Sequence, residues 1–193
     1  MNSLSIQPLK DVSLLKNFHC GIQAMDDFIH SGLEGSMRNH YCNTYSVHFG
    51  TELVAMFALS FDSLELDADS VEEMSEGLSS NKPEMSKEYV DTFLSKHHYP
   101  ALEIAYLAVE ERYRRQGMGK SIVNAIADMA QKQNMAGCMF LTVEAYVEKD
   151  YSAVPFYYSC HFVPCEFKKP NKETLRMFRA IYPRICEYET KDT

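Results

Sequence analysis

The feature that most constrains the fold is the stretch of residues 106–130, where an apolar run meets two glycines and then a helical pattern. The run ends at residues 107–109 and predicts a buried strand. Gly117 and Gly119 leave the neighbouring backbone amides uncovered by side chains. Apolar residues then recur at helical spacing, at Ile122, Ile126, Met129 and Ala130. The stretch therefore predicts a strand, a tight glycine turn and an amphipathic helix.

This turn predicts a binding site for an anion. A helix N-terminus carries partial positive charge and unpaired N–H donors. Four cations lie within nine residues of a chain whose formal net charge is -8, namely Arg112, Arg114, Arg115 and Lys120. That local reversal of charge suggests a phosphate-bearing ligand. The alternative is that the glycines only permit a tight turn and that the arginines are solvated.

The spacing Arg114-x-x-Gly117-x-Gly119, between a strand and a helix, resembles the acetyl-CoA signature of the GNAT superfamily of N-acetyltransferases. The two glycines are too close together for a Walker P-loop, and a dinucleotide fingerprint needs three glycines. The resemblance implies an enzyme in which the pantetheine arm of acetyl-CoA pairs with the strand and the turn holds the pyrophosphate. It assigns cofactor binding to Leu107, Ala108, Val109, Arg114, Arg115, Gln116, Gly117, Met118, Gly119 and Lys120.

The segment from Ala153 to Phe162 resembles the superfamily's Ala-x-x-Phe/Leu-Tyr-x-x-x-Gly-Phe pattern. The resemblance places Tyr157 beside the thioester sulfur, where the leaving thiolate of coenzyme A must be protonated. His161 stands where glycine is usual and must tolerate that turn geometry. Asp150 stands where asparagine is common. The alternative for Tyr157 is a packing role among the neighbouring aromatic residues.

Glu103 is the candidate general base. It begins the segment Glu103–Val109, which is similar to the strand that carries the catalytic glutamate of histone-type acetyltransferases. Burial of this strand would raise the pKa of the carboxyl group toward a useful range. The alternative is an exposed position at the strand end, after Pro100. The six cysteines show no Cys/His/Asn arrangement that would support a covalent acyl-cysteine route, so we expect the amine to attack acetyl-CoA directly in a ternary complex. The cysteines also show no C-x-x-C pair, so no metal site is predicted.

The patterns predict an α/β fold with a GNAT-like mixed central sheet in the order β-α-α-β-β-β-α-β-α-β-β. Residues 1–193 are expected to form a single N-acetyltransferase domain, with an acidic insertion at residues 62–99 before the central strand. The predicted strands are residues 4–9, 44–49, 52–60, 101–110, 138–145, 162–167 and 174–182. The predicted helices are residues 11–17, 23–39, 117–134 (with Gly137 as its cap) and 152–159. Residues 62–76 contain seven acids and no base, so a solvated insertion is the simplest interpretation.

The sequence constrains the amine that accepts the acetyl group less than it constrains the acetyl donor. Phe18-x-Cys20-Gly21-x-x-x-Met25-Asp26-x-Phe28-Ile29 and Ala58-Leu59-Ser60 look like the GNAT toxins of bacterial toxin–antitoxin pairs, which acetylate aminoacyl-tRNA. A tRNA is a polyanion, whereas this chain has a pI near 5.4. Basic residues near the C-terminus could form one patch or a solvated strand pair: Lys168, Lys169, Lys172, Arg176, Arg179 and Arg184. The acidic insertion could instead attract a cationic amine.

These observations predict an N-acetyltransferase that moves acetyl from acetyl-CoA to a primary amine of a small molecule or peptide. Two alternatives stay open: a toxin that acetylates aminoacyl-tRNA, and a catalytically silent acyl-CoA-binding regulatory protein. The chain shows no signal peptide and no apolar run of membrane-spanning length. Scattered thiols fit a reducing compartment, so a cytoplasmic location without a membrane partner is expected. Dimers are common in the superfamily, so a homodimer is compatible with the resemblance.

Overall fold

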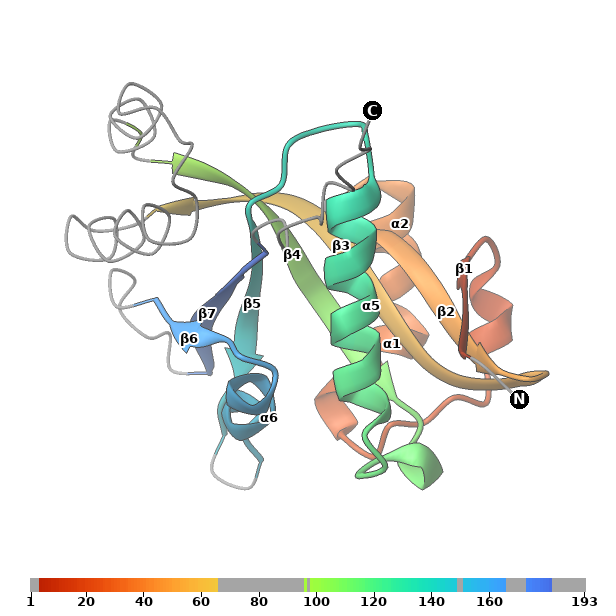
Figure 1. Ribbon diagram of the computed structural model, residues 1–193. Helices are drawn as coiled ribbons and strands as arrows, with labels where there is room; N and C mark the ends of the chain where they lie inside the picture. The colour runs from red at the N-terminus through yellow and green to blue at the C-terminus, as the bar shows by residue number, and fades with distance from the viewer. Residues whose placement is uncertain (1–3, 66–95, 97, 149–150, 166–172, 182–193) are drawn as a thin grey trace, which may run out of the picture. The chain divides into compact units, whose positions relative to one another are not determined.

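The computed structural model describes residues 4–65, 96, 98–148, 151–165 and 173–181, which divide into two units (Figure 1). Unit 1 comprises the residues up to Phe61 together with 102–136, and unit 2 comprises residues 62–101 together with those from Gly137 onward. Two long strands, β3 and β4, contribute residues to both units. A single acetyltransferase domain over the whole chain stays a prediction.

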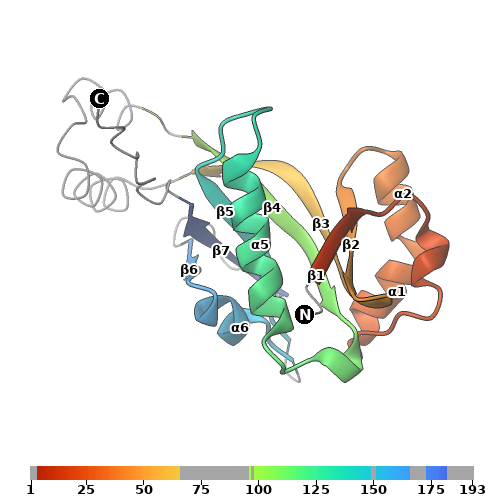
Figure 2. The ribbon, with the colours of Figure 1, turned by 45° about the vertical axis from the view of Figure 1, so that its right-hand side comes forward.

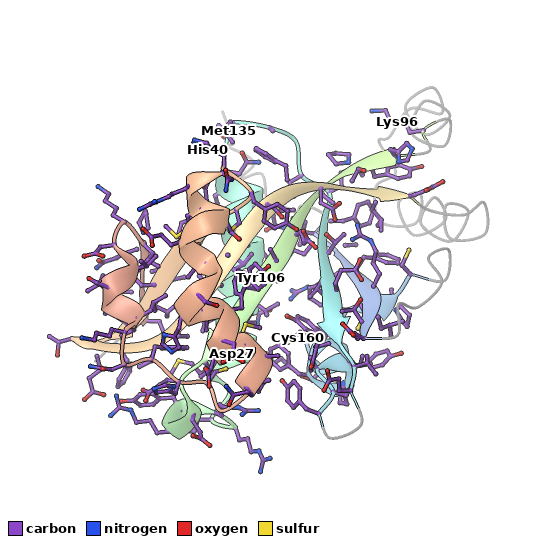
Figure 3. The ribbon with its side chains drawn as sticks, turned by 180° about the vertical axis from the view of Figure 1, so that it is seen from behind. Asp27, His40, Lys96, Tyr106, Met135 and Cys160 are labelled. Atoms are coloured by element: carbon purple, nitrogen blue, oxygen red, sulfur yellow. The ribbon has the colours of Figure 1, made fainter. Side chains whose placement is uncertain are left out.

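Unit 1 contains four neighbouring strands in the order β1-β2-β3-β4. Its elements are β1 (Leu4–Pro8), α1 (Gln23–Ser31), α2 (Leu33–Arg38), β2 (Asn43–Phe49), the first part of β3 (Glu52–Glu65), most of β4 (His98–Val109) and α5 (Met118–Lys132), with short 3-10 helices η1 (Val12–Leu15) and η2 (Glu111–Tyr113). Strand β1 pairs antiparallel with β2 at the sheet edge (Figure 2), and β2 pairs antiparallel with β3. Helices α1 and α2 cover one face of these strands and α5 covers the other, as the front and rear views show (Figures 1 and 3).

Apolar side chains on both faces of these strands form the core of unit 1. Of the stripe of α5 predicted from the sequence, Ile122, Ile126 and Ala130 are buried and Met129 is partly buried. Val123 is also fully inaccessible. On the other face a cluster joins the N-terminal helices to the sheet; its buried members are Leu9, Leu15, Phe18, Cys20, Ile29, Leu33, Met56 and Ala108. Burial of this kind stabilises the fold by about 25 cal/mol per Å² of apolar surface.

The helix predicted over residues 23–39 is broken at Gly32 into α1 and α2. A Cβ atom at Gly32 would lie 2.8 Å from Cδ2 of Phe28, so no other residue fits without moving that ring. The Phe28 ring in turn stacks on Tyr106 of β4, with centroids 3.8 Å apart. A Cβ atom at Gly35 would meet no heavy atom of the described residues within 4 Å, so space does not require glycine there.

Unit 2 contains the outer ends of β3 and β4 together with β5 (Phe140–Tyr146), α6 (Val154–Ser159), β6 (Val163–Pro164) and β7 (Thr174–Ala180). The strand order is β4-β5-β7-β6, and β7 pairs antiparallel with both β5 and β6. A second core cluster centres on the fully buried Leu64, Tyr99 and Phe140. Within the described residues the predicted order of helices and strands is confirmed, except that residues 12–15 form a 3-10 helix and the helix predicted over 23–39 is divided in two.

Several predicted boundaries were wrong. Strand β3 continues to Glu65 and β4 begins at His98, so the predicted insertion starts and ends in strands rather than in solvated chain. Residues 66–95, which include five of the seven acids, lie outside the described residues. Helix α5 ends at Lys132, where Gln133 is already extended, so Gly137 is not its cap. Strand β6 has two residues where six were predicted.

A network of partly buried charges joins three strands of unit 2. Arg176 on β7 donates from Nη2 to Asp62 Oδ2 at 2.6 Å and from Nη1 to Glu144 Oε1 at 3.2 Å. Thr142 donates a second hydrogen bond to the same Asp62 oxygen, and Thr174 donates to Glu144. Burial alone would raise the pKa of Asp62, but the hydrogen bonds from Thr142 and Arg176 outweigh it and the pKa is lowered.

His161 follows α6 with a φ of 66°, in the left-handed region that glycine favours. We expect the change His161→Gly to raise the free energy of unfolding by about 1 kcal/mol, because a Cβ atom is disfavoured in this conformation. Chemical denaturation followed by circular dichroism measures the change. The matched control is His98→Gly: His98 is also exposed, but its φ is not positive and glycine there weakens a strand. Equal loss of stability in both variants would contradict the expectation.

Candidate active site

The glycine turn lies between β4 and α5 in unit 1 and has two left-handed residues. Arg115 has a φ of 61°, and Gly117, the residue before α5, has a φ of 79°. The first hydrogen bond of α5 runs from the Ser121 amide to the Gly117 carbonyl at 3.1 Å. The amides that precede Ser121 in the first turn of the helix therefore have no partner in its own ladder. These donors, at the positive end of a helix of 15 residues, can bind an anion.

The four cations of the turn differ in what they contact. Arg112 forms an ion pair with Glu110 at 2.6 Å, and its guanidinium lies over the Tyr113 ring. Arg114 donates from Nη1 to the backbone carbonyl of Cys20 at 3.0 Å. Arg115 and Lys120 are exposed and form no ion pair with another described residue. The resemblance assigns cofactor binding to Arg114, Arg115 and Lys120 alike, whereas the structure leaves Arg115 and Lys120 as the cations most available to a ligand.

The remaining residues assigned to cofactor binding lie in the same part of unit 1. Residues 107–109 end β4, residues 114–117 form the turn, and residues 118–120 form the first turn of α5. The side chain of Ala108 is buried in the core, so only its backbone is available to a ligand. Gln116 donates from its side chain to the Arg112 carbonyl at 2.9 Å and closes the turn on itself.

Glu103 is half-buried on β4 and is held by the neighbouring strand. The Ser60 hydroxyl of β3 donates to Glu103 Oε2 at 2.8 Å. The other carboxylate oxygen accepts no hydrogen bond from a described residue. No catalytic role was predicted for Ser60, although it is the polar residue that ends the apolar run of the predicted strand 52–60. The expectation that Glu103 lies at an exposed strand end is not met, since β4 begins five residues earlier, at His98.

Tyr106, labelled in Figure 3, is a further polar residue on this strand that sequence reasoning missed. Burial raises the pKa of its hydroxyl, and the neighbouring Tyr41, Cys42 and Glu103 raise it further. Its phenol is therefore neutral at physiological pH. A polar side chain within a predicted apolar strand was the signal that could have identified Tyr106. Its stacking on Phe28 could not be predicted in this way, because it depends on where α1 packs.

Tyr157 belongs to α6 in unit 2 and is 6% exposed. Its ring contacts those of Phe156 and Phe162, with centroids 5.0 and 5.2 Å away. Its hydroxyl forms no hydrogen bond with any residue that the structure describes. Burial raises the pKa of Tyr157, and the nearby Tyr151 and Cys160 raise it further. The ring packs as the alternative predicted, yet the phenol stays protonated and has no described partner, which is an unusual state for a buried hydroxyl.

Two other expectations concern metals and basic patches. Within the described ranges, no three His, Cys, Asp or Glu side chains cluster as metal ligands would. Arg176, for which a basic patch and a solvated strand pair were the two alternatives, is instead partly buried and forms ion pairs with Asp62 and Glu144. Lys168, Lys169, Lys172 and Arg184 lie outside the described residues. Among the helices that the structure describes, none is long and apolar enough to span a membrane.

Comparisons with known proteins agree with this fold. Residues 87–164 match the family described as "Acetyltransferase (GNAT) domain". The comparison with curated proteins finds no match to the chain. Similar solved structures include a tyrosine-to-phenylalanine mutant of the toxin AtaT bound to the C-terminus of the antitoxin AtaR and acetyl-CoA; it is 18% identical, with 92% of this chain and 93% of that chain covered and a TM-score of 0.58.

Two further structures extend this likeness. AtaT complexed with acetyl-methionyl-tRNAfMet is 22% identical, with 90% of this chain and 94% of that chain covered and a TM-score of 0.58. A tyrosine-to-phenylalanine mutant of KacT is 18% identical, with 94% and 96% covered and a TM-score of 0.61. The predicted α/β fold with a mixed sheet is thereby confirmed. The chain has the GNAT fold, and its residues 87–164 match the GNAT acetyltransferase family.

Proposed function

We propose that this protein is an N-acetyltransferase that moves acetyl from acetyl-CoA to a primary amine, with the amino group of aminoacyl-tRNA as the leading acceptor. The observation that supports the donor is the glycine turn before α5. Its unpaired first-turn amides, together with the exposed Arg115 and Lys120, suit the phosphates of coenzyme A. The backbone of residues 107–109 would pair with the pantetheine arm as an added strand does. AtaT, which shares this fold, has been solved with acetyl-CoA.

The proposed chemistry needs one proton donor and one proton acceptor. The acceptor amine attacks the carbonyl carbon of the thioester; a C–N bond forms, the C–S bond breaks, and its electron pair goes to sulfur. Tyr157 donates its hydroxyl proton to that sulfur, and its raised pKa keeps the proton in place until then. Glu103 takes the proton that the amine nitrogen loses, directly or through a water molecule. The carboxyl group then releases its proton to solvent, and Tyr157 regains one.

The relatives favour aminoacyl-tRNA as the acceptor. AtaT has been solved with acetyl-methionyl-tRNAfMet, and that structure covers 90% of the present chain. The segment from Phe18 to Ile29 is the part of the sequence that looks most like such toxins. The net charge of -8 opposes the approach of a polyanion, so binding of tRNA would depend on local Lys and Arg residues, and the number of their phosphate contacts would set its salt dependence.

Transfer of labelled acetyl from acetyl-CoA tests the proposal. The acceptors are a panel of charged tRNAs, beside polyamines, free amino acids and lysine peptides, with uncharged tRNA as the blank. Label on charged tRNA alone supports the whole proposal. Label on a small amine or peptide supports the acetyltransferase and overturns the tRNA acceptor. Coenzyme A binding without transfer to any amine overturns catalysis and favours the silent acyl-CoA-binding protein.

The substitution Glu103→Gln tests the general base. We expect kcat to fall by about a hundredfold because the amide cannot accept the proton, while KM for acetyl-CoA stays unchanged. Ser60→Ala is the graded control: it removes the hydrogen bond to Glu103 but leaves the carboxylate, so a smaller loss is expected. Steady-state kinetics on the best acceptor measures both. Full turnover by the Gln variant would remove Glu103 from the mechanism.

A further inference from the structure

Two successive peptide groups link helix α1 to the glycine turn within unit 1. In the peptide between His19 and Cys20, the N–H donates to Asp26 Oδ1 at 2.7 Å and the C=O accepts from the Glu111 amide at 2.9 Å. In the peptide between Cys20 and Gly21, the N–H donates to Asp26 Oδ2 at 3.3 Å and the C=O accepts from Arg114 Nη1 at 3.0 Å. Both oxygens of one carboxylate are therefore connected, through one peptide each, to the turn.

The charge of Asp26 strengthens both connections. A carboxylate polarises the N–H groups that it binds, and this makes the carbonyl at the other end of each peptide a better acceptor. The Asp26 side chain is 14% exposed, so water weakens the effect little. The Cys20 side chain is buried in the core of unit 1, which fixes the middle of the link. Arg114, which the resemblance assigns to phosphate binding, thus donates to a peptide group whose N–H is bound by Asp26.

Gly21 is the residue that permits this arrangement. Its φ of 76° is left-handed, and a Cβ atom there would lie 3.0 Å from Cδ and Oε1 of Glu111. Any side chain would push against the first residue of η2, which leads into the turn. The turn itself is short and has two left-handed residues, so its conformation needs support from outside.

We infer that Asp26 and Gly21 are positioning residues for the phosphates of acetyl-CoA, acting through Glu111 and Arg114 on the turn before α5. This inference rests on the proposed function. It assigns a task to the segment from Phe18 to Asp26, which is otherwise remote in sequence from the cofactor signature. If the link were merely structural, its loss would weaken the binding of all ligands and lower the stability of the fold together. If it positions the turn, its loss weakens only the binding of the phosphate-bearing part of the ligand.

The test compares Asp26→Ala with Asp27→Ala, its neighbour on the same helix (Figure 3). Asp27 is exposed, and its carboxylate accepts a hydrogen bond from Gln23 alone among the described residues, so its loss leaves the link intact. Calorimetry gives Kd for three probes: coenzyme A, adenosine 3′,5′-bisphosphate as its nucleotide part, and pantetheine as its phosphate-free part. For Asp26→Ala we expect Kd to rise roughly tenfold for the first two probes and to stay unchanged for pantetheine.

Two further variants keep the test decisive if Asp26→Ala does not fold. Asp26→Asn keeps one carbonyl oxygen for the Cys20 amide but loses the charge, and Gly21→Ala changes the link without touching Asp26. Both are expected to show the same selective loss. The double variant Asp26→Ala, Arg114→Met should lose less coenzyme A affinity than the sum of the losses in the two single variants, because both substitutions break the same connection.

The outcomes separate the two proposals. A wild-type protein that does not bind coenzyme A overturns the proposed function itself. If wild type binds coenzyme A and the Asp26 variants match Asp27→Ala, the positioning role is wrong. Equal weakening of all three probes, with a lower free energy of unfolding, also overturns it in favour of a structural link.

Discussion

We expect the substitution Tyr157→Phe to lower kcat by about a hundredfold or more and to leave Kd for acetyl-CoA unchanged. The phenyl ring keeps its contacts with Phe156 and Phe162, and the lost hydroxyl binds no described residue, so the fold is retained. What disappears is the proton for the leaving thiolate. The assay is single-turnover transfer from acetyl-CoA, with calorimetry for binding.

A neighbouring tyrosine supplies the matched control. Tyr158 lies on the same helix but is 51% exposed, so Tyr158→Phe should leave kcat unchanged. Normal turnover in Tyr157→Phe, or equal losses in both variants, would exclude Tyr157 as the general acid.

The raised pKa of Tyr157 also predicts a dependence on alkaline pH. Above pH 10 an unfolded chain loses this phenolic proton, whereas the folded chain keeps it. The folded state then binds more protons, so this group's contribution to stability, full below pH 10, is lost as pH rises through the folded value. The free energy of unfolding should therefore fall more steeply above pH 10 in wild type than in Tyr157→Phe. Parallel curves would contradict the burial of the hydroxyl in solution.

Replacing Arg176 by methionine has the largest expected effect on stability, a loss of about 3–5 kcal/mol in the free energy of unfolding. The arginine side chain is 10% exposed, and its partners Asp62 and Glu144 are 20% and 31% exposed. Without the guanidinium, two carboxylates remain close together with little water to compensate them. Urea denaturation at pH 7 measures the loss.

The surface pair of Arg38 and Glu34 is the matched control. Its ion pair has the same length of 2.6 Å, but both side chains are more than half exposed. Arg38→Met should therefore change stability very little. Restoring neutrality in the triple variant Arg176→Met, Asp62→Asn, Glu144→Gln should recover much of the loss. Equal effects of the Arg176 and Arg38 substitutions would show that burial does not govern this network.

The same network predicts a sensitivity to acid. The pKa of Asp62 is lowered below its ordinary value of 3.8, so the carboxylate binds protons more weakly in the folded state. Its stabilising contribution is present above pH 3.8 and is lost as pH falls through the folded value.

Local backbone rules were readable from the sequence. The glycine turn was predicted because left-handed and closely approached positions favour glycine, and Gly117 does have a positive φ. His161 was predicted to take turn geometry from its place in a segment that usually has glycine, and its φ is 66°. Both predictions depend on short segments of sequence, and the second rests on the superfamily pattern that its segment resembles.

Contacts between distant residues were not readable in this way. Arg176 and Asp62 are 114 positions apart, so nothing near Arg176 indicated that it would be buried between carboxylates rather than exposed in a basic patch. The link from Asp26 to Arg114 depends equally on where α1 packs. The helix break at Gly32 was missed for the same reason, because the ring that needs its space is held by a strand more than 70 residues later.

Gly32 and Gly35, the two glycines of the N-terminal helices, differ in the substitutions that they can tolerate. At position 32 the ring of Phe28, which stacks on Tyr106, fills the volume that any side chain would need. This packing requires glycine at a position where the helix is interrupted. At position 35 the space is open, and any good helix former is sterically allowed. Homologues of this chain should therefore vary freely at position 35 and keep glycine at position 32 wherever they keep both aromatic rings.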